Sequence, residues 1–146
     1  MSSPPSSPPE PGWGLTFAAF LLAAGSSLGS LFFSEVMELA PCSLCWYQRI
    51  FMFPLPLVLL RGLLPYDPQV GRYALPLAAM GLGVAVWHTL LYLGVLPEEA
   101  APCTMGVPCS QPTFTMFGVF SIPVLSMLAF MGVVGLLLFQ RRRVLS

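Results

Sequence analysis

The residues in this sequence best suited to chemistry are its four cysteines, which form two close pairs. Cys42 and Cys45 enclose two residues, whereas Cys103 and Cys109 lie six positions apart. Such pairs can form inert disulfides, hold a zinc ion or exchange electrons with other thiols. A disulfide across two intervening residues closes a very small loop, which gives little chain-entropy stabilisation, and its strain makes it easy to reduce. The spacing of Cys42 and Cys45 therefore favours thiol–disulfide exchange over stapling.

The residues that follow this pair suggest how a thiolate would be stabilised there. The pair precedes an apolar run and is expected at a helix N-terminus, where backbone N–H groups favour a thiolate. Arg49 follows Cys45 by four positions, which places both on one helix face. A guanidinium inside a spanning helix costs about 2.5–3.5 kcal/mol, although snorkelling reduces that cost. Arg49 is therefore predicted to stabilise a thiolate, or to hold the carbonyl oxygen of a ligand that becomes anionic on reduction.

The composition says what kind of protein must position these groups. Of the 146 residues, 56% are apolar and only 8% are charged, and the six acidic and six basic residues cancel. A typical soluble domain is about 25% charged. The mean hydropathy of +0.81 also exceeds what a soluble surface allows. These values exclude a soluble enzyme, a disordered protein and a nucleic-acid binder, and they indicate an integral membrane protein. Strand-like alternation is absent from the sequence, so the protein is expected to be all-α.

Four apolar runs are each long enough to cross a bilayer, which takes about 20 residues. We therefore expect a four-helix transmembrane bundle over residues 15–146, with spans at 15–33, 46–64, 73–96 and 116–139. Residues 1–14 are rich in Pro and Ser and are predicted to be a disordered tail. They contain no Lys or Arg, which disfavours a cleaved signal peptide. Gly25 and Gly29 in the first run form a G-x-x-x-G, which predicts close helix packing.

The arginines predict which side each loop faces. Arg61 and Arg72 flank the turn between the second and third runs, and three arginines at 141–143 follow the fourth run. By the positive-inside rule, this turn and both termini are cytoplasmic. The two remaining loops then face outward, and all four cysteines lie in them. We therefore expect a multi-pass plasma-membrane protein with its cysteines in the extracytoplasmic compartment, where disulfides persist.

Two cofactor classes are disfavoured by the same residues. A four-cysteine zinc site does not suit an oxidising compartment, and Cys103 and Cys109 are not a C-x-x-C, so no metal is expected. His88 is the single histidine and excludes a bis-histidine haem. It lies in the third run, where it either contacts a neighbouring backbone group or hydroxyl or belongs to a ligand site.

The run Cys42-Ser-Leu-Cys45-Trp-Tyr-Gln48-Arg49 resembles the C-x-x-C-x-Y-Q-R signature of the DsbB/BdbC family of disulfide-forming membrane proteins. The resemblance extends to the four helices, the second cysteine pair and the Phe/Ile/Pro-rich stretch at 118–123. Only five residues separate Cys103 from Cys109, whereas longer members carry a much wider spacing. The chain is therefore similar to the short-loop BdbC type.

The resemblance implies a thiol–quinone oxidoreductase that drives disulfide bond formation in exported proteins. Its redox-active disulfides would be Cys42–Cys45 and Cys103–Cys109. It would re-oxidise a thioredoxin-like thiol oxidase of the DsbA/BdbD type through Cys103 and pass the electrons through Cys45 to a membrane quinone, either ubiquinone or menaquinone. The resemblance also places Arg49, Gln48 and His88 beside the quinone, as its binding residues.

Two alternative functions remain open from the residues. One is a non-catalytic four-helix membrane subunit whose disulfides are structural. The other is a quinone reductase of the vitamin K epoxide reductase type, which also joins cysteine pairs to a quinone. That type is less favoured because its active C-x-x-C lies late in the chain, whereas here the motif opens the second span.

Overall fold

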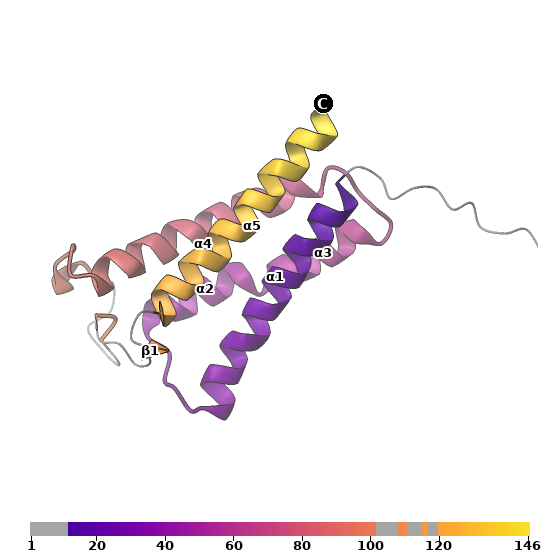
Figure 1. The fold of residues 1–146 in the computed structure, drawn as a ribbon. Coiled ribbons are helices and arrows are strands. Elements are labelled where there is room, and N and C mark those ends of the chain that lie inside the picture. Colours follow the sequence, from indigo (N-terminus) through magenta and orange to yellow (C-terminus); the bar gives the residue numbers. More distant parts are fainter. Residues whose placement is uncertain (1–11, 102–107, 111–114, 117–119) are drawn as a thin grey trace, which may run out of the picture.

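The computed structural model describes residues 12–101, 108–110, 115–116 and 120–146, and this part of the chain folds as a helical bundle (Figure 1). Within it, four helical segments are long and apolar enough to cross a membrane: Trp13–Val36, Ser43–Leu63, Val70–Tyr92 and Ile122–Leu145. The predicted all-α, four-span membrane fold is confirmed. Residues 1–11 of the predicted tail lie outside the described residues.

The spans are built from five α-helices and short irregular elements. Helix α1 (Trp13–Leu31) continues into a π-helical turn, η1 (Phe32–Val36). The second span consists of α2 (Ser43–Met52) and α3 (Pro54–Leu63). The rest of the described chain forms α4 (Val70–Tyr92), a 3-10 turn η2 (Glu98–Ala100), strands β1 (Thr115–Met116) and β2 (Phe120–Ser121), and α5 (Ile122–Leu145). The two strands pair antiparallel.

Several predicted helix boundaries differ from the structure by a few residues, and two of these differences have a clear local cause. The third span ends at Tyr92 rather than 96, because Gly94 adopts a φ of +72° and its N–H returns to the carbonyl of Leu91. The fourth span begins at Ile122 rather than 116, because the β1–β2 pair precedes it. Pro123 occupies the first turn of α5, where its missing N–H costs nothing.

Prolines divide the second span. The helix breaks between Met52 and Pro54, and Pro56 has no N–H for the carbonyl of Met52 four positions earlier. The hydroxyl of Ser27 on α1 donates to the carbonyl of Ala23 at 2.9 Å and lies 3.5 Å from that of Met52. A polar group of the neighbouring helix therefore lies beside the carbonyl that Pro56 leaves free.

The core lies midway along the bundle, where α5 packs against α1 and α4, and α3 packs against α1. Its buried members are mostly small or aliphatic: Ala19, Ala23, Leu55, Leu59, Ala74, Ala78, Ala85, Val133 and Leu137, with Phe130 as the largest. Gly81 permits this packing, because a Cβ there would lie 2.2 Å from the Phe130 ring. At one end of α4, the Thr89 hydroxyl donates to the carbonyls of Ala85 and Pro123 and links α4 to α5.

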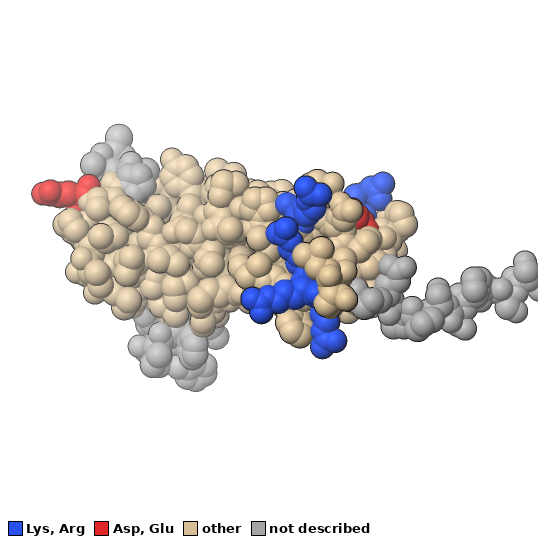
Figure 2. Space-filling model, turned by 90° about the horizontal axis from the view of Figure 1, so that it is seen from above, with Lys and Arg blue, Asp and Glu red and all other residues tan. Residues whose placement is uncertain are grey.

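On the face shown in Figure 2, charged side chains lie toward the two ends of the bundle. The blue side chains, which are all arginines, gather toward the end that carries the C-terminus, and an acidic side chain lies beside them. Other acidic side chains lie at the opposite end. This separation is the charge pattern on which the predicted orientation depends.

The predicted sidedness can be tested by thiol labelling in a variant whose native cysteines are replaced by serine. Glu99 and Gln69 are both exposed but lie in loops predicted to face opposite sides. We expect Glu99→Cys to react with a membrane-impermeant maleimide in intact cells, and Gln69→Cys to react only after permeabilisation. A reporter fused after Ser146 should behave as cytoplasmic. The reverse labelling pattern would overturn the orientation.

Candidate redox site at the start of the second span

The C-x-x-C pair sits where the second span begins. Cys42 is the N-cap of α2, in an extended backbone conformation, and Cys45 is the third helical residue. Side chains at these two positions face each other, as in a capping box. The two sulfur atoms lie 3.1 Å apart in this structure, both as thiols. A small movement therefore suffices to form or open a disulfide.

His88 lies beside this pair on a neighbouring helix, and Gln48 lies beside it on the same helix. His88 on α4 is 2% exposed, and its Nε2 lies 3.6 Å from the Cys42 sulfur. Its other ring nitrogen, Nδ1, lies 3.0 Å from Nε2 of Gln48 on α2. As placed, the Gln48 amide donates to Nδ1, so Nε2 carries the ring proton and donates toward Cys42. The buried side chains of Gln48 and His88 thus satisfy each other by a hydrogen bond between the two spans.

The proton balance of the pair follows from these contacts. The hydrogen bond with Cys45 and burial raise the pKa of the Cys42 thiol to about 12, and His88 opposes that rise. The sequence predicted lowered thiol pKa values for a C-x-x-C at a helix N-terminus, which Cys42 does not show. The reason is that loss of the Cys42 proton would break its hydrogen bond with Cys45 and leave a buried thiolate beside that sulfur. In the reduced pair, Cys42 keeps its proton.

The outer loop brings one of its cysteines to the same place. Cys109 is buried in a small cluster with Cys42, Leu44 and Leu91, against which Cys45 also packs. Cys103, the other predicted loop cysteine, lies outside the described residues. The structure therefore joins three of the four predicted cysteines in one cluster at the start of α2.

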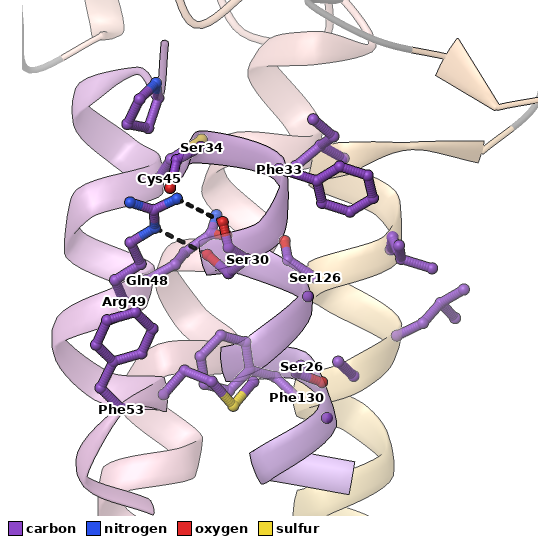
Figure 3. Close-up of a pocket in the computed structure, with 18 of the residues that line it drawn as sticks. Ser26, Ser30, Phe33, Ser34, Cys45, Gln48, Arg49, Phe53, Ser126 and Phe130 are labelled. Carbon is purple, nitrogen blue, oxygen red and sulfur yellow. Dashed lines mark hydrogen bonds between the residues drawn. The ribbon is translucent and has the colours of Figure 1, made fainter. Parts of the chain in front are cut away.

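Arg49 lies one turn further along α2 and is anchored to α1 (Figure 3). Its Nε donates to the Ser30 hydroxyl at 2.8 Å, and its Nη2 donates to the Ser30 carbonyl at 2.9 Å. The guanidinium also lies over the Trp46 ring, 5.2 Å from its centroid. Ser30 was not singled out in the sequence, because a serine in an apolar run carries no periodic signal. Arg49 itself was an indirect signal, because an arginine inside a membrane span is costly and therefore requires polar partners.

A cavity of about 550 Å³ opens between α1, α2 and α5. Cys45, Gln48 and Arg49 line it from α2. The remaining wall is mainly apolar or small: Leu21, Leu22, Gly25, Ser26, Gly29, Ser30, Phe33, Met52, Phe53, Ile122, Leu125, Ser126, Leu128, Ala129 and Phe130 are among its members. Its size is typical of a ligand pocket, and such pockets combine an apolar wall with a few polar groups. Neither Cys42 nor His88 is among the described residues that line it.

The G-x-x-x-G of α1 shapes this cavity, which corrects the prediction of close helix packing. A Cβ built at Gly25 or Gly29 would meet no atom of the described chain within 4 Å, and both residues line the cavity. The four-residue spacing does put both on one helix face, but that face looks into open space. Missing side chains here enlarge the cavity, whereas at Gly81 they allow contact.

These glycines allow the cavity to be filled without disturbing the core. We expect Gly25→Leu or Gly29→Leu to leave thermal stability unchanged or raised, because leucine is the better helix former. The added side chain should weaken the binding of a ligand in the cavity by about 1–3 kcal/mol, typical of overpacking, which is roughly 5- to 150-fold in affinity. Binding and turnover of a quinone in detergent would measure this loss.

Gly135 on α5 provides the matched control. A Cβ there also meets no described atom within 4 Å, but the residue does not line the cavity. Gly135→Leu should leave quinone kinetics unchanged. Equal kinetics in the Gly25, Gly29 and Gly135 variants would show that the cavity takes no part in turnover.

The pair thus has two sides with different neighbours. Cys42 lies beside His88, whereas Cys45 borders the cavity beside Arg49, and both adjoin the cluster that holds Cys109. A C-x-x-C between a loop cysteine and an apolar cavity, in a four-span membrane bundle, defines a membrane oxidoreductase of the thiol–disulfide class.

Comparison with known proteins identifies the family. The sequence model described as disulfide bond formation protein DsbB matches residues 13–140. The chain is 46% identical over 132 residues to a probable disulfide formation protein of Metapseudomonas resinovorans, covering 90% of this chain and 92% of the relative. It is 39% identical over 118 residues to disulfide bond formation protein C of Bacillus subtilis, covering 81% and 86%. No solved structure matches the chain. The chain belongs to the DsbB family of disulfide bond formation proteins.

Proposed function

We propose that this protein re-oxidises an extracytoplasmic thioredoxin-like thiol oxidase, of the type called DsbA or BdbD, and passes the electrons to a membrane quinone. Residues 15–146 form the catalytic domain, and the cysteine-bearing loops face the extracytoplasmic side. Its membership of a membrane oxidoreductase family that forms disulfides supports the general reaction. The non-catalytic subunit is the alternative that experiments must exclude. Family membership removes the support for the vitamin K epoxide reductase type.

The observation that carries the proposal is the division between the two faces of the C-x-x-C pair. Cys45 borders the cavity with Arg49, whereas Cys42 is not among the described residues that line it, and both cysteines adjoin the cluster that holds Cys109. A protein partner is too large to enter the cavity, and a membrane-dissolved acceptor has no reason to enter the loop. Electrons from a partner can therefore enter through the loop pair and leave through Cys45.

The residues around the cavity suit a quinone. Its apolar wall fits a ring and the start of an isoprenoid tail, and Arg49 supplies N–H donors for a carbonyl oxygen. When bound, a quinone would accept two electrons and two protons. Arg49, held by Ser30, would orient the ring and favour negative charge on its oxygen. Gln48 lines the cavity and also contacts His88, so His88 would act on the pair through Cys42 and Gln48.

The proposed thiol steps are a series of disulfide exchanges. A partner thiolate attacks Cys103 in the Cys103–Cys109 disulfide, and resolution of that mixed disulfide oxidises the partner and leaves the loop pair as thiols. The Cys109 thiolate then attacks Cys42 in the Cys42–Cys45 disulfide, which releases Cys45 as a thiolate at the cavity. Attack by Cys103 on Cys109 restores the loop disulfide and leaves Cys42 and Cys45 with both electrons. His88 can donate a hydrogen bond to Cys42 when it leaves as a thiolate.

The driving force requires an acceptor other than an ordinary disulfide. A strong thiol oxidase has a reduction potential of about −120 mV, so a disulfide of more negative potential cannot re-oxidise it. The proposal is tested by anaerobic assay of the purified protein with a reduced thioredoxin-like oxidase and ubiquinone or menaquinone. One quinone should be reduced for each partner disulfide formed. Partner oxidation without quinone reduction, or neither reaction, would contradict the proposal.

A further inference from the structure

Three soft metal-binding side chains converge at the start of the second span. The Cys42 sulfur lies 3.1 Å from that of Cys45 and 3.6 Å from Nε2 of His88, and all three atoms lie within 4.8 Å of one another. Cys42 and His88 are buried, and Cys45 is partly buried. We propose that the dithiol form of this group binds one thiophilic divalent cation, with Zn²⁺ as the physiological candidate.

The distances are close to those that zinc requires. Bond lengths of about 2.3 Å to sulfur and about 2.0–2.1 Å to nitrogen place tetrahedral sulfur ligands about 3.8 Å apart and sulfur about 3.6 Å from nitrogen. The Cys42–His88 separation already has the second value. The two sulfurs must move apart by about 0.7 Å from their present 3.1 Å. Three protein ligands leave one position for water, the pattern of an exchangeable zinc site.

The charge balance suits this buried position. Binding releases one proton from each thiol, so that two thiolates and a neutral imidazole surround a 2+ ion. The resulting group carries no net charge, which avoids the cost of burying an unpaired ion. A univalent cation on the same ligands would leave a net negative charge. The ligand set therefore selects a divalent thiophilic ion.

Gln48 can orient His88 for either role. As placed, the Gln48 amide donates to Nδ1, and Nε2 carries the proton. A half-turn of that amide presents its oxygen to Nδ1–H, which leaves the Nε2 lone pair free to face the metal. Such a second hydrogen bond is the usual support of a zinc-bound histidine. One side chain thus serves the thiol form and the metal form without a backbone change.

The site exists only in one redox state. In the Cys42–Cys45 disulfide both sulfurs are bonded to each other, so the oxidised protein lacks two of the three ligands. This distinguishes the site from a permanent four-cysteine zinc centre, which the oxidising compartment disfavours. If the pair cycles as proposed above, bound zinc would hold it reduced and block transfer from Cys45. Zinc would then be a reversible inhibitor of turnover.

Metal binding can be measured without quinone or partner, so its failure is distinguishable from failure of the proposed function. The full chain carrying Cys103→Ser and Cys109→Ser is reduced, freed of reductant and titrated with Cd²⁺, whose thiolate bonds absorb in the ultraviolet. We expect one Cd²⁺ per chain, two protons released and displacement by Zn²⁺. The oxidised protein should bind none, and Cys42→Ser or Cys45→Ser should abolish the signal.

Removal of His88 distinguishes the proposed site from a bare dithiol. His88→Leu should weaken Cd²⁺ binding at least about 100-fold, and Gln48→Leu about 10-fold, in the range for loss of an outer partner. X-ray absorption of the zinc-loaded parent supplies a test that needs no His88 variant, and it should show two sulfur neighbours and imidazole scattering. Unchanged affinity in His88→Leu, absence of imidazole scattering, or binding by the oxidised chain would each overturn the site.

Discussion

Replacing Cys42 or Cys45 by serine is expected to abolish quinone reduction, whichever thiol donates the electrons. Neither variant can form the disulfide at the start of α2, and Cys45 is the cysteine among the described residues that borders the cavity. No other described thiol can take its place there. The measurement is anaerobic quinone reduction, first with a reduced thioredoxin-like partner and then with a small dithiol. Both donors should give background rates.

The loop cysteines should give a different result. Cys103→Ser or Cys109→Ser is expected to block oxidation of the protein partner, because the partner enters through the loop disulfide. A small dithiol should still reduce the Cys42–Cys45 disulfide and sustain quinone reduction in both variants. Turnover in all four serine variants, with loss of thermal stability alone, would instead show that the disulfides are structural and take no part in electron transfer.

The spans were predictable because each depends on one strong local property. A run of about 20 apolar residues has no stable place except a bilayer or a large core. Their ends depend on weaker signals, and several were placed wrongly by a few residues. Gly94 ends α4 through a positive φ, and the β1–β2 pair delays α5 until Ile122. Gly94 and Pro123 stand near these two ends in the sequence, but each lies within an apolar run that predicts a continuous helix.

The chemistry of the site was predictable at the level of one helix. The spacing of Cys42, Cys45 and Arg49 places all three near one end of α2 by helical geometry alone. Contacts between helices were not predictable from spacing. The partner of Arg49 is Ser30, which lies 19 positions earlier in the chain, on a different helix. Gly25 and Gly29 predicted a packing surface, because the spacing of small residues is the same whether a helix or a cavity lies opposite them.

His88 illustrates the same limit in a different way. Its burial in an apolar span predicted a polar partner, and the structure supplies Gln48 and Cys42. The resemblance placed both His88 and Gln48 beside a quinone. In the structure Gln48 borders the cavity, whereas His88 lies behind it, against Cys42. We therefore propose that His88 acts through Gln48 and Cys42 rather than by direct contact with a quinone.

Arg49→Ala is expected to fold but to lose quinone affinity and turnover by roughly 10- to 150-fold. Reduction places negative charge on the acceptor oxygen and needs a thiolate at Cys45, and a fixed cation beside both stabilises them in an apolar setting. The loss corresponds to about 1.5–3 kcal/mol, typical of a hydrogen bond to a charged group. Steady-state quinone kinetics and thermal unfolding of the same preparations separate this effect from instability.

The anchoring of Arg49 makes the prediction sharper than loss of charge alone. Arg49→Lys should recover only part of the activity, because an ammonium cannot reproduce two donors directed at Ser30 while facing the cavity. Ser30→Ala removes the hydroxyl but leaves its carbonyl, so the loss should be smaller than in Arg49→Ala, and the two losses should not add. Additive losses would show that Ser30 acts independently. Wild-type kinetics in Arg49→Ala would mean that the guanidinium only satisfies its own burial through Ser30 and Trp46, and the acceptor site would have to lie elsewhere.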